Sequence, residues 1–158
     1  MKKSLVLVLN CGSSSIKFAV VEPQDGVSVI SGLMQNIGFP EANLKYSKDE
    51  EIVIRDLPHV DYNAALQIIV GLLGDYKEVM GSIFAVGHRV VHGGEYYSKA
   101  TLITPSVIKK IKDLSELAPL HNPPNLAGIL GCKKHLPKIK QVAVFDTAFH
   151  QTMSEEAF

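Results

Sequence analysis

The segment NCGSSSIK, residues 10–17, has more polar side chains than a turn between two apolar runs requires. A hairpin needs only a glycine and an asparagine to turn. Gly12 allows close approach to the backbone, and consecutive N–H groups in a tight turn form a concave site for an anion. The three serine hydroxyls and the Lys17 ammonium suit phosphate, and the Asn10 side-chain oxygen suits a hydrated Mg²⁺ ion. The segment therefore indicates a phosphate-binding turn, with a solvated hairpin as an equally supported alternative.

The segment GHRVVHGGE places Arg89 inside an apolar strand. An unpaired guanidinium is costly to bury, so we expect Arg89 to be buried beside an anion. A carboxylate or phosphate ligand is favoured, because the planar guanidinium binds such groups at two points; an internal ion pair is the alternative. His88 and His92 would share one face of the strand about 13 Å apart, too far to bind one metal ion. These two histidines are interpreted as structural.

Two further segments place polar side chains beside structural breaks. In LHNPPN, two prolines stiffen a loop that holds His121 before a helix, while Asn122 or Asn125 could simply cap that helix. In VFDTAFH, Asp146 directly follows an apolar strand. Proteins of the α/β class place ligand-facing groups at the carboxyl ends of strands, although a capping aspartate would give the same pattern.

The apolar pattern predicts the elements that must position these side chains. An antiparallel meander followed by alternating helices and strands predicts an α/β domain with a mixed sheet. The first strand is a continuous apolar run, so we expect it to be buried on both faces. The expected strands lie at 5–9, 16–21, 27–33, 44–46, 52–54, 84–91 and 141–145, and the expected helices follow Asp61, Thr104 and Asn122-Pro123-Pro124.

Composition limits the classes of function. The 158 residues carry 16 Lys and Arg against 16 Asp and Glu, a balance without the broad positive field that binds nucleic acid or anionic membranes. The apolar runs are too short to cross a bilayer, and the 2 cysteines, without a CxxC spacing, are interpreted as reduced thiols. We therefore expect a cytoplasmic protein with no nucleic-acid partner and no membrane partner.

The four segments together closely resemble acetate kinases, of the acetate/propionate/butyrate kinase family. LVLNCGSSSIKF, VGHRVVHGGE, LAPLHNPPN and VFDTAFHQTM occur in the family's order, and the resemblance runs from the first strand to the last residue. The resemblance implies an actin-like ATPase fold of the ribonuclease H type, in which two related domains clamp ATP. It also implies reversible, Mg²⁺- or Mn²⁺-dependent transfer of the γ-phosphate of ATP to acetate, which gives acetyl phosphate and ADP.

The resemblance implies roles on the phosphate side of that reaction for four residues of the first segment. Asn10 resembles the residue near the metal ion. Ser13, Ser15 and Lys17 resemble contacts to the phosphates of ATP.

The resemblance implies the remaining roles for residues of the other three segments. Arg89 resembles the residue that pairs with the acetate carboxylate, and Val91 and Leu120 resemble part of the apolar pocket around the methyl group. His121 resembles a donor to the transferred phosphoryl group, and Asp146 resembles the catalytic aspartate. A carboxylate nucleophile, with a solution pKa of about 4, needs no general base, so we expect Asp146 mainly to hold Mg²⁺ and its water.

Members of this family are considerably longer than 158 residues. Residues 1–158 are therefore expected to be the N-terminal domain of a two-domain acetokinase, with the second, nucleotide-binding domain absent from this chain. The full-length enzyme is expected to be a homodimer, and the isolated chain to be inactive. Two alternatives remain open: a propionate or butyrate kinase, or a non-catalytic phosphate-binding module.

Overall fold

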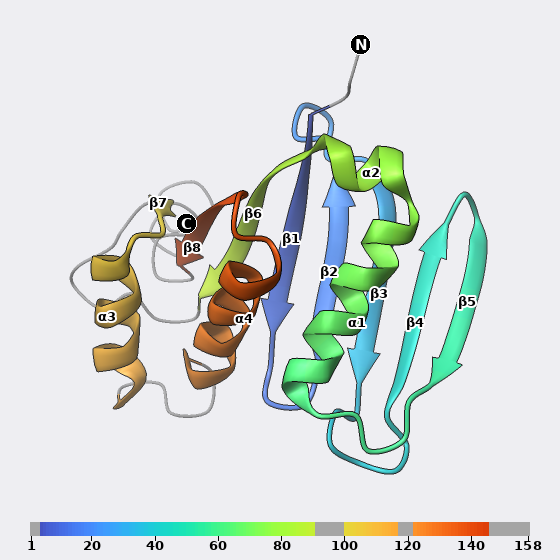
Figure 1. Ribbon diagram of the computed structural model, residues 1–158, viewed down its shortest axis with the longest axis horizontal. Coiled ribbons are helices and arrows are strands. Elements are labelled where there is room, and N and C mark those ends of the chain that lie inside the picture. The colour runs from blue at the N-terminus through green and yellow to red at the C-terminus, as the bar shows by residue number, and fades with distance from the viewer. Residues whose placement is uncertain (1–3, 91–99, 117–121, 146–158) are drawn as a thin grey trace, which may run out of the picture.

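A single mixed sheet organises the described part of the chain (Figure 1). The structure, a computed structural model, describes residues 4–90, 100–116 and 122–145. The strands are β1 (Leu5–Cys11), β2 (Ile16–Val21), β3 (Ser28–Gln35), β4 (Asn43–Lys48), β5 (Glu51–Asp56), β6 (Ile83–Val90), β7 (Thr101–Leu102) and β8 (Lys140–Phe145). They lie in the order β5-β4-β3-β2-β1-β6-β8-β7.

The direction of the strands divides the sheet into two parts. The strands β1 to β3 form the antiparallel meander that the sequence predicts, and the predicted pair β4 and β5 continues it. On the other side of β1, β6 and then β8 run parallel to it, and β7 pairs antiparallel with β8 at the edge. Parallel neighbours need crossover connections, which the helices supply. The helices are α1 (Tyr62–Asp75), α2 (Lys77–Ser82), α3 (Pro105–Asp113) and α4 (Asn122–His135).

The core lies between the helices and one face of this sheet (Figure 1). Leu7 and Leu9 of β1 are buried beneath the helices, whereas Val8, which points the other way, is 40% exposed. The expectation that the first strand is buried on both faces is therefore wrong for the described residues. We call the face opposite the helices the open face. On the central strands it carries Val6, Val8, Asn10, Lys17, Ala85, Arg89, Val142 and Val144.

Two helices begin at the caps that the sequence predicts. The Asp61 carboxylate accepts a hydrogen bond from the Ala64 N–H at 2.7 Å, at the start of α1. The Thr104 hydroxyl accepts one from the Val107 N–H at 3.3 Å, at the start of α3. Each cap satisfies a backbone donor that the first helical turn leaves without a partner.

The helix α4 begins at Asn122, earlier than predicted, so both prolines lie in its first turn. Proline is tolerated there because the N–H groups of the first turn have no helical acceptor. Asn125, which the sequence allowed as a cap, instead lies inside the helix and is 2% exposed. The sequence also failed to predict the short elements α2 and β7. Across the described ranges, no helix has both the length and the apolar character needed to span a membrane.

Candidate functional site

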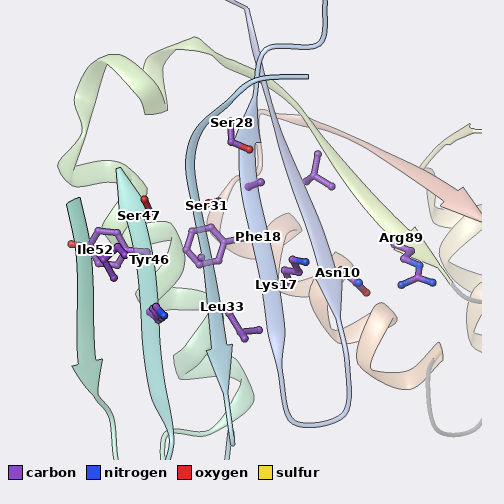
Figure 2. A pocket seen from close by; sticks show the side chains of 14 residues that line it. Asn10, Lys17, Phe18, Ser28, Ser31, Leu33, Tyr46, Ser47, Ile52 and Arg89 are labelled. Atoms are coloured by element: carbon purple, nitrogen blue, oxygen red, sulfur yellow. The ribbon is translucent and has the colours of Figure 1, made fainter. Parts of the chain in front are cut away.

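Three of the polar residues that the sequence singled out lie on the open face, in one row across neighbouring strands (Figure 2). Asn10 of β1 is directly opposite Lys17 of β2 in the antiparallel ladder. The parallel pairing of β1 with β6 ends at Leu9 and His88, so Asn10 and Arg89 are the next residues on those two strands. At the usual strand spacing, this row spans about 10 Å from β2 to β6.

The side chain of Arg89 is exposed. The expectation that it is buried inside an apolar strand is therefore wrong. Alternate residues of β6 face opposite sides of the sheet, so His88 and Val90 are buried while Arg89 points from the open face. Because the side chain is exposed, burial does not require an internal anion beside it, and its planar fork has the shape to bind a carboxylate or phosphate at two points.

Two hollows meet at Arg89, at one end of this row. One, of about 560 Å³, is lined by Asn10, Lys17 and Arg89 together with residues of β3 and β4 (Figure 2). The other, of about 660 Å³, is almost wholly apolar and is lined by residues of β1, β6 and β8, including Val144. Arg89 lines both hollows, so its charge lies at the border between them, beside the apolar surface of each.

The turn between β1 and β2 is held tightly by its backbone. The Gly12 N–H donates to the Ser15 carbonyl at 2.8 Å, and the Ile37 N–H donates to the Ser14 carbonyl at 2.9 Å. A Cβ on Gly12 would lie 3.0 Å from the Ser15 hydroxyl oxygen, closer than such atoms normally approach. The glycine therefore allows this hydroxyl to lie against the backbone. Ser13 is exposed at the tip of the turn.

His88 has the structural role that the sequence predicted. It is 2% exposed on the helix-covered face, and its Nε2 is 2.5 Å from the Gln141 side-chain oxygen. Burial lowers the pKa of His88 to about 4, despite the opposing effect of this hydrogen bond. The neutral tautomer with a proton on Nε2 donates to Gln141, which satisfies both buried polar groups.

The thiols of Cys11 and Cys132 are buried and free, in agreement with the interpretation of them as reduced cysteines. Burial raises the pKa of Cys11 to about 11 and that of Cys132 to about 12. These thiols stay protonated at neutral pH and have no nucleophilic character there. Within the described ranges, no group of three His, Cys, Asp or Glu side chains could hold a metal ion.

Five further candidates lie outside the described residues. They are Val91, His92, Leu120, His121 and Asp146. Their proximity to the row of Asn10, Lys17 and Arg89 stays a prediction.

Two residues that the sequence analysis did not connect with the turn contact its backbone. Tyr62, the first residue of α1, donates its hydroxyl hydrogen to the Gly12 carbonyl at 2.9 Å. Asn125 of α4 donates through Nδ2 to the Cys11 carbonyl at 2.7 Å. No local pattern marks Tyr62, but a polar amide at a buried position of α4 was a possible signal for Asn125.

Comparison with known proteins identifies relatives along nearly the whole chain. The family model described as the Acetokinase family matches residues 5–158. Acetate kinase 1 of Vibrio cholerae is 48% identical over 155 residues, which cover 98% of this chain and 39% of that protein. The acetate kinase of Histophilus somni is 49% identical over 161 residues, which cover 100% of this chain and 40% of that protein.

Solved structures of acetate and propionate kinases also match this chain. A propionate kinase from Francisella tularensis matches with a TM-score of 0.89 and 44% identity, over 95% of this chain and 38% of that one. The acetate kinase of Porphyromonas gingivalis matches with a TM-score of 0.85 and 44% identity, over 95% and 39%. These likenesses confirm the actin-like fold class predicted from the sequence. This chain, which spans 39–40% of the length of the two curated relatives named above, belongs to the acetokinase family.

Proposed function

We propose that the whole protein transfers the γ-phosphate of ATP to acetate, reversibly and with Mg²⁺ or Mn²⁺, to give acetyl phosphate and ADP. The observation that carries the proposal is the row of Lys17, Asn10 and Arg89 beside a serine-rich turn. Two cations and one neutral amide oxygen stand about one strand spacing apart. Phosphoryl transfer needs reactants held in line and negative charge neutralised on the moving group, rather than covalent help from the protein.

On the phosphate side, Ser13, Ser15 and Lys17 bind the phosphates of ATP. The Lys17 side chain is exposed beside Asn10 and supplies a mobile positive charge. Serine hydroxyls at the turn supply donors to phosphate oxygens.

On the acyl side, Arg89 pairs with the carboxylate of acetate. Its position at the border of an apolar hollow suits a ligand with one charged end and one apolar end. We assign the methyl pocket to Val91 and Leu120, and a hydrogen bond to the transferred phosphoryl group to His121.

The described residues suit a metal ion that keeps most of its water. Asn10 offers a single neutral oxygen, and Mg²⁺ commonly binds through one or two protein ligands plus substrate phosphates. We assign a second ligand to Asp146, which holds Mg²⁺ and its water. The ion, when bound, neutralises charge on the phosphates.

The share of each relative that the chain covers, 39–40%, supports the proposed domain organisation. Residues 1–158 would be the N-terminal domain of a two-domain enzyme, and a second, nucleotide-binding domain would complete the site. The isolated chain is then inactive, because it holds only one side of the cleft. A homodimeric full-length enzyme and a cytoplasmic location stay predictions.

Propionate or butyrate is the alternative acceptor, since one solved relative is a propionate kinase. One methylene changes the free energy of binding in an apolar pocket by only about 1–3 kcal/mol. The volume of the proposed acyl pocket therefore determines which of these carboxylates is the preferred acceptor. A non-catalytic phosphate-binding module is the second alternative, and it predicts binding without turnover.

A chimaera tests the proposal directly. Residues 1–158 would be joined to the part of the Vibrio cholerae acetate kinase that follows its matched segment, and acyl phosphate formed from Mg-ATP and acetate would be trapped with hydroxylamine. We expect turnover that falls at least about 100-fold in Lys17→Ala. Lys134→Ala, at an exposed lysine in the last turn of α4 that lines neither hollow, should leave turnover unchanged.

Each outcome of this experiment has a defined meaning. The isolated chain should give no acyl phosphate above its own Lys17→Ala variant. A folded chimaera without turnover, or equal losses in both lysine variants, would contradict the proposed function.

A further inference from the structure

We infer that Tyr62 and Asn125 are positioning residues that hold the β1–β2 turn in its phosphate-binding shape. The inference rests on the proposed role of this turn. Neither residue belongs to the row on the open face, and both reach the turn from helices that cover the opposite face. Both donate to main-chain carbonyl groups, those of Gly12 and Cys11, and Tyr62 also hydrogen-bonds the Cys11 thiol, so their effect on a ligand is transmitted through the backbone.

The Tyr62 hydroxyl makes two contacts with the turn. It donates to the Gly12 carbonyl at 2.9 Å and lies 3.4 Å from the Ser15 carbonyl. Partial burial raises the pKa of Tyr62 above its ordinary value, so the phenol keeps its proton and acts as a donor. The contact joins residues 50 positions apart in the sequence and fixes the turn to the start of α1.

Asn125 fixes the strand just before the turn. Its side chain is 2% exposed, and Nδ2 donates to the carbonyl of Cys11, the last residue of β1. A buried amide costs free energy unless it is hydrogen-bonded, so loss of the bond to Cys11 would leave a buried polar group without this partner. The side chain joins α4 to the point at which the chain leaves the sheet.

The geometry of the peptide bond means that a hydrogen bond to a carbonyl group also fixes the direction of the next N–H. In the turn this applies to the carbonyl groups held by Tyr62 and by the Ile37 N–H, whereas Asn125 fixes the end of β1, from which the turn starts. In a trans peptide the C=O and the following N–H point in opposite directions. Tyr62 holds the Gly12 carbonyl, so the Ser13 N–H points away from α1. The Ile37 N–H holds the Ser14 carbonyl, so the Ser15 N–H points away from that anchor. Each of these two serines then carries a fixed N–H beside its own hydroxyl, a pair of donors suited to an anion.

Removal of the Tyr62 hydroxyl should therefore weaken phosphate binding without a general loss of structure. The Gly12–Ser13 peptide would lose its anchor and could rotate, and the Ser13 N–H would no longer be held in a fixed direction. One hydrogen bond of this kind corresponds to about a three- to tenfold change in a dissociation constant.

The test uses the 158-residue chain labelled with ¹⁵N and titrated with inorganic phosphate in the presence of Mg²⁺. Shifts of the Ser13 and Ser15 amide signals report the dissociation constant. We expect it to rise about three- to tenfold in Tyr62→Phe. Tyr76→Phe is the matched control, because Tyr76 is a half-buried tyrosine at the other end of α1 that hydrogen-bonds Tyr46.

Further variants separate this inference from the proposed function. Lys17→Ala should abolish the shifts at the serine amides. Lost binding in Lys17→Ala with unchanged binding in both Tyr62→Phe and Asn125→Ala would overturn the inference and leave the proposed function standing. Unchanged amide signals in the parent chain across the titration would also overturn the inference, whereas the proposed function is decided by turnover of the chimaera.

Urea unfolding of the same variants distinguishes positioning from a purely structural role. A structural role predicts similar losses of unfolding free energy in Tyr62→Phe and Tyr76→Phe, with an unchanged dissociation constant in both. That result would overturn the inference. If Tyr62→Phe did not fold, Asn125→Ala would supply the same comparison, with a rise in the dissociation constant supporting the inference and an unchanged constant refuting it.

Discussion

Gly128 of α4 lies so close to Cys11 of β1 that a Cβ on the glycine would stand 2.6 Å from the Cys11 sulfur. Real side chains do not approach this closely, so glycine is what lets the helix reach the strand. Cys11 is also the residue whose carbonyl accepts the Asn125 hydrogen bond. The helix–strand approach therefore sets the position of the turn that follows Cys11.

The first prediction concerns this approach. Gly128→Ala should lower the free energy of unfolding by about 1–3 kcal/mol, because Cys11 is short and cannot move its sulfur aside without a shift of the helix. Urea unfolding monitored by circular dichroism measures the change.

Two other glycines provide controls for this substitution. At Gly71 a Cβ meets nothing within 4 Å, so Gly71→Ala should stabilise α1 by about 0.5–1 kcal/mol. At Gly131 the Cβ would meet the terminal Cδ1 of Leu66 at 2.6 Å, a flexible group that can rotate away, so the loss should be smaller than at Gly128. Equal effects at all three positions would refute the close-packing argument.

The second prediction concerns the guanidinium of Arg89. In the chimaera, Arg89→Lys should raise the KM for acetate at least about tenfold, because lysine keeps the charge but cannot bind a carboxylate at two points. The KM for ATP should stay within about twofold of the parent value, a change worth less than 0.5 kcal/mol. Since Arg89 is exposed, the fold should not be affected. A parallel rise in both constants would show that Arg89 does not select the acyl substrate.

The local parts of the fold could be predicted from the sequence. The caps at Asp61 and Thr104 and the antiparallel meander depend on short-range hydrogen bonds and on alternation within a few residues. The number of faces that a sheet buries is not a local property. The apolar run of β1 suggested two buried faces, and the same reasoning wrongly placed Arg89 in the interior.

The candidate site was predictable as a list of residues but not as an arrangement. The side chains of Asn10 and Lys17 lie together because a hairpin pairs them. The short turn between the two predicted strands makes this pairing close to predictable from the sequence. Arg89 joins them only because β6 pairs in parallel with β1, across a connection that contains α1 and α2. The contact between Tyr62 and Gly12 depends on tertiary packing, which no pattern within either segment encodes.

The third prediction is a loss of stability in mild acid that depends on His88. Burial lowers the pKa of this side chain from 6.5 to about 4, so between these values the unfolded chain binds more protons than the folded one. The contribution of His88 is complete above pH 6.5 and is lost as the pH falls toward 4, by up to about 3 kcal/mol. Urea unfolding at a series of pH values measures it.

Variants isolate this contribution from the other histidines. His88→Gln should flatten the dependence of unfolding free energy on pH between about 4 and 6.5, whatever its effect at pH 7. His59→Asn is the control, because His59 is exposed and asparagine tolerates its left-handed backbone, with φ of 61°. An unchanged pH dependence in His88→Gln would refute the assignment.

The fourth prediction concerns the two buried thiols. Because burial raises the pKa of Cys11 to about 11 and that of Cys132 to about 12, almost no thiolate exists at pH 8 in the folded chain. Iodoacetamide at pH 8 should therefore modify neither residue while the chain is folded, and both in urea, as measured by intact mass. In Gly128→Ala the displaced helix should expose Cys11, so this residue should react first, while Cys132 stays protected. Rapid modification of Cys11 in the folded parent chain would mean that α4 does not cover the end of β1, and would remove the basis for assigning Asn125 a part in holding the turn.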